Sequence, residues 1–328
     1  MDLFGKSVMG ISGNELYDGL TVVIPVFNRA ELVGRTLSSL ASQTRMPDEV
    51  ILVDNASTDG SLDVLEQWGD EMRSRGWNVR VLSELRPGGA RARQTGLENV
   101  ATDKVLFFDS DDVMLPGHIG NVKAEFEAHP EADIVVWQTA TILPDGSRRL
   151  KPLLPGRFME SHQLHAMLAT QAYAVRTEFI RAVGGWDTKL MGWDDLELGH
   201  RLLLADPKIT VSKESNVLIY PQGEASITGA DYTHRRGEWE HVIDLMEENT
   251  IRSGRSDIHH IMRLLAYRRT ILAALYAREG NRNAAEEQLA VALRKPHLNL
   301  LQRLYLRTAY AVTSRGIRGA SRPAPYIL

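Results

Sequence analysis

Three carboxylates stand within four residues directly after an apolar run. The segment V-L-F-F-D-S-D-D ends in Asp109, Asp111 and Asp112. Carboxylates this close repel one another, and each raises the pKa of its neighbours unless a cation neutralises them. Hard oxygen ligands of this kind select Mg²⁺ or Mn²⁺. The pattern therefore predicts a divalent metal site, and the alternative is that these acidic residues cap the helix that follows.

The elements that must position these carboxylates alternate between strand and helix patterns. Short β-branched or apolar runs predict strands at residues 20–26, 50–53, 79–82 and 105–108. Apolar residues at helical spacing predict helices at residues 32–40, 61–75 and 90–100. Strands that alternate with helices indicate an α/β fold with a doubly wound, mixed but mostly parallel sheet.

Polar residues follow three of these strands. They are residues 27–29, 54–59 and 109–112. Ligands of doubly wound sheets bind beyond the carboxyl ends of the strands, so we expect these residues to line one site. A divalent ion held by the last group could bridge a diphosphate and stabilise the negative charge on a departing nucleotide.

The second half of the chain changes character twice. Beyond Trp137 the alternation is less regular, and a second group of patterns predicts strands at residues 172–176, 209–212 and 217–220 with a helix at 194–205. From about Glu238 onward almost every stretch has helical period, and 271–293 predicts a helical hairpin. We therefore expect a catalytic domain over residues 1–236 and an all-helical extension over residues 237–328.

The composition is that of an ordinary globular protein and excludes several chemistries. The 328 residues carry a formal net charge of −4, which gives no overall electrostatic reason to expect a nucleic-acid partner. Cysteine is absent, which excludes disulfides, thiolate metal sites and cysteine nucleophiles. The amino terminus has no apolar signal segment, and no run approaches the ~18 apolar residues of a spanning helix. We expect a cytoplasmic protein.

Four motifs appear in an order that is informative as a set. They are T-V-V-I-P-V-F-N-R at 21–29, V-I-L-V-D-N-A-S-T-D-G-S at 50–61, G-G-A-R-A-R-Q-T-G-L at 88–97 and the D-S-D-D segment at 109–112. Together they resemble glycosyltransferase family 2 over roughly residues 20–225. The resemblance implies a GT-A fold and metal-dependent transfer of a sugar from a nucleotide diphosphate, most often UDP, to an acceptor hydroxyl. It also implies inversion at the anomeric carbon, although a retaining mechanism stays open.

The resemblance assigns a nucleoside pocket to the first two motifs. The residues that would line it are Pro25, Phe27 and Arg29. Asp54 would accept a hydrogen bond from the base, and a carboxylate, which only accepts, suits the N3–H of uracil. Asn55 stands where the family commonly has a second Asp. The alternative is that Asp54 forms a turn with Ser57.

The resemblance also places a basic residue beside the diphosphate. Arg93 occupies that place, with Asp109 next to the same donor phosphates. A guanidinium can contact phosphate oxygens in bidentate fashion. Arg91 is the alternate, and both arginines could instead be solvated helix residues.

The segment G-G-W-D-T-K-L-M-G-W-D-D-L-E-L-G-H-R-L, at 184–202, resembles the acceptor site of these transferases. By that resemblance Asp195 is the general base that takes the acceptor proton, and Asp194 binds the acceptor or orients the base. The alternative is that both are helix-start residues, which the helix dipole favours. Trp186 and Trp193 could form a platform for a sugar ring or belong to the core.

His234 is the remaining candidate metal ligand. It follows the last strand pattern and a glycine-containing loop, where related transferases can supply a third ligand. A neutral imidazole suits Mn²⁺ better than Mg²⁺. The alternative is an exposed loop histidine.

The last forty residues are basic. After Gln288 the chain has seven Lys or Arg and no Asp or Glu, and 298–312 has an apolar helix face. A basic amphipathic helix can lie on the anionic inner face of a membrane, which would suit a lipid-linked acceptor. The alternative is that the apolar face packs on the preceding helical hairpin. A glycan, a peptide or a small molecule are further acceptor classes.

Two rival functions use similar residues. A nucleotidyltransferase also binds metal through carboxylates, but residues 21–29 lack the glycine-rich, basic phosphate loop that it would normally show. A non-catalytic module that binds sugar nucleotides or glycans would have no need of the acidic pair Asp194 and Asp195.

Overall fold

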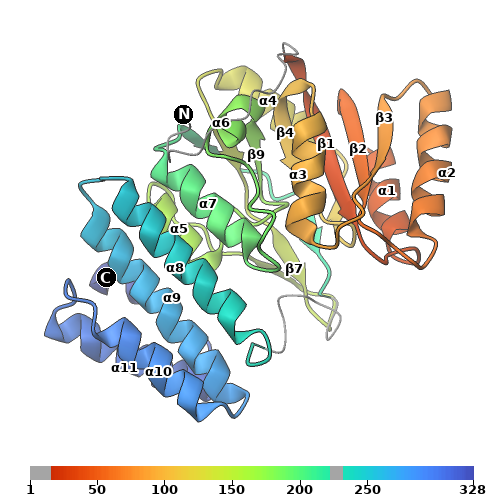
Figure 1. Cartoon of the computed structure of the whole chain (residues 1–328). Helices are drawn as coiled ribbons and strands as arrows, with labels where there is room; N and C mark the ends of the chain where they lie inside the picture. The colour runs from red at the N-terminus through yellow and green to blue at the C-terminus, as the bar shows by residue number, and fades with distance from the viewer. Residues whose placement is uncertain (1–15, 222–231) are drawn as a thin grey trace.

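The computed structural model describes residues 16–221 and 232–328. A seven-stranded sheet forms the centre, in the order β10-β6-β9-β4-β1-β2-β3 (Figure 1). Its strands are β1 Tyr17–Val26, β2 Glu49–Asp54, β3 Val79–Ser83, β4 Thr102–Phe107, β6 Ile134–Val136, β9 Tyr173–Arg176 and β10 Ile209–Val211. Its pairings are parallel except for those of β9, which runs antiparallel to β4 and β6. The predicted mixed, mostly parallel sheet is confirmed.

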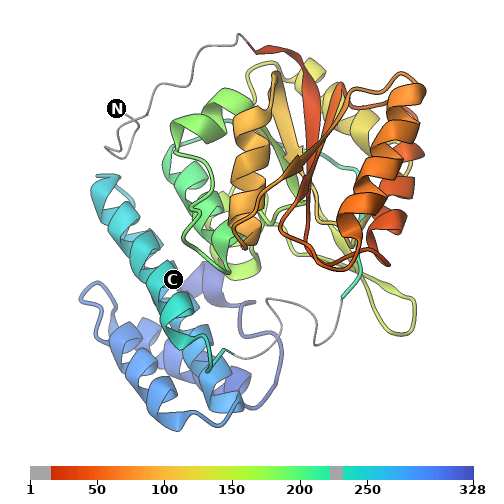
Figure 2. The same cartoon turned by 45° about the vertical axis from the view of Figure 1, so that its right-hand side comes forward.

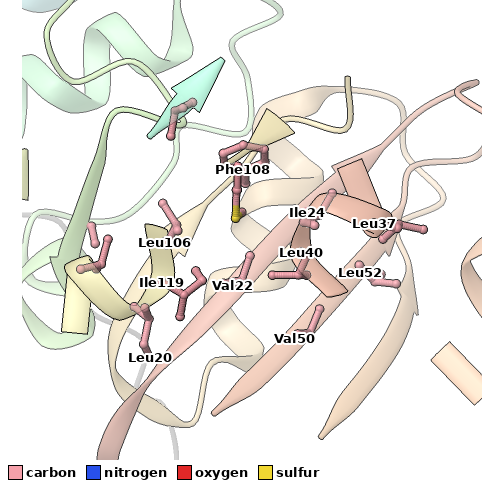
Figure 3. Packing of buried hydrophobic residues seen from close by; sticks show 14 of the residues in the cluster. Leu20, Val22, Ile24, Leu37, Leu40, Val50, Leu52, Leu106, Phe108 and Ile119 are labelled. Carbon is pink, nitrogen blue, oxygen red and sulfur yellow. The ribbon is translucent and has the colours of Figure 1, made fainter. Parts of the chain in front are cut away.

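Each central strand is buried on both faces, which explains its unbroken apolar sequence. Val22 and Ile24 of β1 and Leu52 of β2 belong to the core under one face, together with Leu40 and Ile119 (Figure 3). The helices of that face are α1 Val33–Ala41, α2 Ser61–Ser74 and α4 His118–Ala128.

The opposite face of the sheet carries three further helices of the described chain. They are α3 Gly89–Asn99, α6 Thr177–Ala182 and α7 Asp194–Leu204. Val23 of β1 packs there with residues of these helices. A Cβ atom added at Gly96 would lie 2.3 Å from Cγ1 of Val23, so only glycine lets α3 approach β1 this closely. This close contact positions the amino-terminal half of α3 beside the ends of β1 and β4.

A second, smaller sheet extends the polar end. It has the order β5-β11-β7-β8, with β5 Val113–Met114, β7 Ala140–Ile142, β8 Arg148–Leu150 and β11 Val217–Ile219. The helix α5, Phe158–His165, follows in the chain. Strands of two or three residues are too short to show a period, and only β11 was predicted from the sequence.

The carboxyl-terminal residues form helices throughout, as predicted. They are α8 Arg236–Arg252, α9 Ile258–Arg278, α10 Arg282–Leu293, α11 Leu300–Ser314 and α12 Ala324–Ile327. The predicted hairpin is α9 and α10, joined at Gly280 with φ +85°. In Figure 2 these helices lie together, apart from strands β1 to β3.

The helices pack on the α/β region through two apolar clusters. Trp239 and Val242 of α8 pack with Leu196 and Leu204 of α7. Leu164 of α5 packs in a second cluster with residues of α9, α11 and α12. The chain therefore has continuous cores across the predicted boundary at residue 236, and that boundary stays a prediction.

Candidate active site

A cleft of about 450 Å³ opens where β1, β2 and β4 end. Its walls come from segments far apart in the sequence. Among its lining residues are Phe27, Arg29, Asp109, Asp111, Asp194 and Asp195. The structure therefore brings together residues from all four sequence motifs and the acidic pair at the start of α7, which comes later in the chain.

Asp54 lies at the end of β2, and only one of its two carboxylate oxygens forms a hydrogen bond in the described chain. Its Oδ2 accepts a hydrogen bond from the Ser57 backbone N–H at 3.2 Å, which forms the alternative turn considered from the sequence. Its Oδ1 is buried and has no hydrogen-bond partner in the described chain. A buried acceptor without a donor is costly, so the turn and a contact with a bound base are compatible.

Asn55 explains a departure from the family pattern. Its Nδ2 donates to the carbonyls of Glu84 at 3.0 Å and Arg86 at 2.9 Å, and its Oδ1 accepts from the Gly88 N–H at 2.8 Å. An aspartate has no N–H to donate to those two carbonyls. Asn55 therefore fixes the loop that leads into α3.

Arg93 on α3 is held between two carboxylates. It donates to Asp109 at 2.8 Å and to Asp194 at 2.8 Å, and its guanidinium carbon lies 5.0 Å from the ring centre of Trp186. Burial alone would lower the pKa of Arg93, but the charges of Asp194 and Asp109 outweigh it and raise that pKa. Arg93 thus joins the acidic loop after β4 to the start of α7.

The three carboxylates of the D-S-D-D segment have different surroundings. Asp111 lies in the cleft 3.8 Å from Arg29, and burial, followed by the charge of Asp109, raises its pKa. Asp112 is 2% exposed, and its oxygens accept from the Tyr220 N–H at 2.9 Å and from Nε2 of Gln171 at 2.6 Å. Burial raises the pKa of Asp112 to about 8. Asp112 therefore fastens the end of β11 to the acidic loop.

The predicted ligand set of Asp109, Asp111, Asp112 and His234 does not come together as a cage. Within residues 16–221 and 232–328, no three His, Asp or Glu side chains form a group that could hold a metal. Both oxygens of Asp112 already accept protein hydrogen bonds, and His234 is exposed in the turn before α8. The described residues therefore do not show this ligand set, and the assignment of all four residues to one metal ion stays a prediction.

Asp109 and Asp111 nevertheless fit a divalent ion that a substrate helps to bind. Both line the cleft, with side chains 28% and 21% exposed. Mg²⁺ usually keeps several waters and binds through one or two carboxylates together with substrate phosphates. A pair of carboxylates that face a cleft is sufficient for such a site.

Asp195 begins α7 beside Asp194 and has an unusual protonation equilibrium. Its Oδ1 accepts from the Leu196 N–H at 2.8 Å, and no donor from the described residues reaches Oδ2. Burial, and next the charge of Asp194, raise the pKa of Asp195 to about 6, while Lys151 acts in the opposite direction. A carboxylate with this pKa can accept a proton near neutral pH.

The two tryptophans of the 184–202 segment have separate roles. Trp186 is buried and packs edge-on against Phe107 at 5.2 Å, so it belongs to the core. Trp193 lines the cleft and has a left-handed backbone with φ +53°. Its ring lies 5.1 Å from that of Trp239 on α8. Packing against α8 helps to hold Trp193 in a conformation that is uncommon for a bulky residue.

The sequence patterns did not identify two cationic side chains that line the cleft. Lys151 follows β8, and Arg268 lies in the middle of α9. Neither residue belongs to a recognisable motif, because one follows an irregular hairpin and the other reads as a helix arginine. Their position in the cleft depends on how the second sheet and α9 pack.

Comparison with known proteins agrees with this geometry. The sequence model of Glycosyl transferase family 2 matches residues 21–178. Residues 21–178 belong to glycosyltransferase family 2. The family 2 segment holds Arg93, Asp109 and Asp111, and it ends before the acidic pair on α7.

Curated proteins that are similar to this chain include a glucosyltransferase. Validoxylamine A glucosyltransferase of Streptomyces hygroscopicus subsp. limoneus is 27% identical over 230 residues, which are 60% of this chain and 50% of the relative. The succinoglycan biosynthesis protein ExoW of Rhizobium meliloti is 37% identical over 105 residues, 31% and 32% of the two chains. The chain spans about half the length, or less, of these relatives.

Solved structures show the fold of the whole chain. Residues 1–349 of S. aureus TarS match with a TM-score of 0.67 at 18% identity, over 94% of this chain and 91% of that one. The mannosyltransferase PcManGT of Pyrobaculum calidifontis, in complex with GDP-Man and Mn²⁺, matches with a TM-score of 0.57 at 18% identity, over 94% and 87%. The expected GT-A-like fold is confirmed.

We predict that Arg93→Gln destabilises the protein by about 3 kcal/mol, because it leaves the half-buried carboxylates of Asp109 and Asp194 without the cation that both contact. Urea denaturation measures the change. Arg91→Gln is the matched control, since Arg91 lies on the same helix and forms no ion pair with the described residues. Equal stability of the two variants would show that the bridge contributes nothing to the fold.

Proposed function

We propose that this protein transfers a sugar from a nucleotide diphosphate sugar, with UDP as the leading nucleotide, to an acceptor hydroxyl. The reaction is metal-dependent and inverts the anomeric carbon. The observation that carries the proposal is one cleft that holds Asp195, a carboxylate with a raised pKa, together with the acidic pair Asp109 and Asp111. A structure of TarS, similar in fold, is in complex with UDP-GlcNAc, which supports a nucleotide-sugar donor.

The donor nucleoside would lie at the ends of β1 and β2. Phe27, whose side chain is 46% exposed, offers a ring face for the base, beside Pro25 and Arg29. The unpaired Oδ1 of Asp54 would accept the N3–H of uracil. This contact would satisfy a buried acceptor that the protein leaves free, and it favours a base with a donor at that position.

The diphosphate would lie between the acidic loop and the arginines. Asp109 and Asp111 would hold Mn²⁺ or Mg²⁺, which neutralises charge on the leaving nucleotide. Arg29 lies 3.8 Å from Asp111, and Arg93 contacts Asp109, so both guanidinium groups adjoin the place where the phosphates would be. These arginines would orient the donor by direct hydrogen bonds to phosphate oxygens.

The acceptor hydroxyl would be activated by Asp195. Its Oδ2 accepts the proton as the hydroxyl oxygen attacks the anomeric carbon from the side opposite the nucleotide. Asp194 is held by Arg93 at 2.8 Å, so it positions the start of α7 and keeps the base aligned with the donor. Trp193 would support the acceptor through its cleft-facing ring.

The general test is a panel of nucleotide sugars with Mn²⁺, followed by donor hydrolysis and by thermal stabilisation. Donor binding raises apparent stability by mass action. Hydrolysis of a UDP-sugar would support the transferase. Stabilisation without turnover of any donor or acceptor would instead favour a non-catalytic module that binds sugar nucleotides.

We predict that Asp195→Asn keeps donor binding but lowers the transfer rate by roughly 10²-fold or more, the usual scale for losing a positioned base. The wild-type rate should fall as the pH drops below about 6, because the pKa of Asp195 is raised to about 6 and only the ionised form accepts a proton. A pH–rate profile measures both effects. Asp194→Asn is the comparison, and it should act mainly on the apparent affinity for the acceptor. A near-normal rate for Asp195→Asn would rule out Asp195 as the base.

We predict that Asp111→Asn folds normally and loses Mn²⁺-dependent UDP binding, because it removes a charged ligand that faces the cleft. Titration calorimetry measures the binding. Asp112→Asn is the matched control, one residue away. It should lower stability, since an amide N–H would oppose a hydrogen-bond donor, and it should leave metal-dependent binding in place. Undiminished Mn²⁺-dependent binding by Asp111→Asn would contradict the metal assignment.

We also propose that the helical region makes peripheral contact with an anionic membrane. The predicted apolar face of α11 is divided. Tyr305 is buried and stacks on Tyr267 at 6.1 Å, but Leu300, Leu301 and Leu304 are 83%, 63% and 60% exposed. No helix in the described part of the chain is both long and apolar enough to cross a bilayer. Packing on the hairpin therefore buries only part of the apolar face of α11 and leaves the three leucines exposed.

We predict that the chain floats with anionic vesicles at low salt and that replacing these three leucines by serine abolishes flotation. Exposed leucines beside arginines gain from both apolar burial and charge. The control replaces Leu85 and Ile251, which are 79% and 61% exposed elsewhere on the surface. If the unmodified chain stays with the soluble fraction, the membrane proposal is wrong.

A further inference from the structure

Two further hollows adjoin the catalytic cleft. One of about 750 Å³ shares Lys151 and Ile219 with the cleft. The other, of about 320 Å³, shares Arg268 with the cleft and the segment around Gly319 with the first hollow. The three hollows therefore adjoin one another through the residues that they share. We call the two hollows outside the cleft the basic groove.

The basic groove carries positive charge without compensation. Its cationic lining residues are Arg149, Lys151, Arg268, Arg278, Arg318 and Arg322. No Asp or Glu is among the described residues that line the two hollows. None of the six cations forms an ion pair within the described ranges, whereas Arg236, on the same helical region, is paired with Glu240 and Glu287. The chain as a whole is acidic, so this concentration of charge is local.

Two of the cations lie where the groove meets the cleft. Burial lowers the pKa of the Lys151 ammonium, and the charge of Asp195 opposes this effect. Burial also lowers the pKa of Arg268 to about 10. The Nε of Arg268 is buried and has no acceptor in the described chain, although its Nη2 donates to the carbonyls of His162 and Gln163. A buried N–H donor without a partner favours an anionic ligand.

The position of the groove distinguishes it from the donor site. The donor phosphates are expected beside Asp109 and Asp111, which line the cleft but neither of the two outer hollows. Lys151 and Arg268 instead lie close enough to the proposed base Asp195 that its negative charge acts to raise the pKa of both side chains, against the lowering by burial. A ligand in the basic groove would therefore enter the cleft from the acceptor side.

We propose that the acceptor carries phosphate groups, with its hydroxyl at Asp195 and its phosphates along the basic groove. The proposal rests on the proposed transferase function. Five of the six cations are arginines, whose planar fork matches phosphate oxygens in bidentate fashion. The same phosphate chemistry occurs in a soluble polyol phosphate chain and in a phospholipid headgroup. Either one would fill a groove that contains no described carboxylate.

The test compares a labelled glycerol phosphate hexamer with a neutral glucose hexamer of similar length, using fluorescence polarisation at low and high salt. The intact protein should bind the phosphate hexamer at least about tenfold more tightly, and salt should weaken this binding. Arg318→Gln combined with Arg322→Gln should reduce it about tenfold or more, because each replacement removes charged hydrogen bonds. Arg282→Gln combined with Arg294→Gln is the matched control, since both arginines are exposed outside the groove.

Three outcomes decide the proposal. The first compares the two hexamers, and also phosphatidylglycerol vesicles with phosphatidylcholine vesicles. If the intact protein binds both hexamers equally and shows no preference between the two kinds of vesicle, the proposal is overturned. Equal loss in the groove and control variants would also overturn it, because the charge effect would not be local. If the groove variants lose binding to phosphatidylglycerol vesicles while the hexamer does not bind, the phosphate chemistry is supported with a lipid as its source. The leucine-to-serine variants of α11 distinguish this binding from apolar contact with the membrane.

Hydrolysis of a UDP-sugar is measured in parallel. The groove variants should retain it, because their side chains lie outside the donor site. If the intact protein binds the phosphate hexamer but hydrolyses no UDP-sugar, the proposed function is refuted and the anion-binding site is still supported. Normal hydrolysis without phosphate preference would refute only the charged acceptor.

Discussion

The double hydrogen bond of Arg93 is the constraint on which the site depends. It joins Asp109 after β4 to Asp194 at the start of α7, residues that are 16 and 101 positions away from it in the chain. Without this cation, Asp109 and Asp194 would lose the positive charge that both of them contact. Arg93 therefore fixes the distance between the acidic loop after β4 and the start of α7 by an electrostatic requirement.

Two buried polar residues keep the surrounding loops in place. Asn55 holds the loop that enters α3, and Asp112 joins the acidic loop to β11 of the second sheet. The polar atoms of both side chains form hydrogen bonds within the protein, so these residues hold the loops in position and leave no polar atom unbonded for a ligand. Two buried groups near these supports have no hydrogen-bond partner in the described chain, namely Oδ1 of Asp54 and Nε of Arg93. Unpaired groups of this kind are where a ligand gains most.

The sequence predicted most strands of the main sheet and many of the residues that line the cleft, because both depend on local patterns. Asp54, Asp112 and His234 were predicted for the same site, but they are not among the residues that line the cleft. The sequence did not distinguish Asp111 from Asp112, since neighbouring residues in one loop can point to opposite sides and only packing decides which. Arg93 was correctly placed near Asp109, but its contact with Asp194 depends on long-range folding. Lys151 and Arg268 escaped notice because no local pattern marks a residue that another element brings to a site.

Arg268 has a consequence for how the two regions unfold. It extends from α9 into the cleft and contacts carbonyls of α5, so one side chain belongs at once to the helical region and to the wall of the α/β region. A ligand bound against Arg268 and Asp195 would favour only those molecules in which both regions are folded and docked. Occupancy would then raise the temperature at which both regions unfold, so the two would be stabilised together by one ligand.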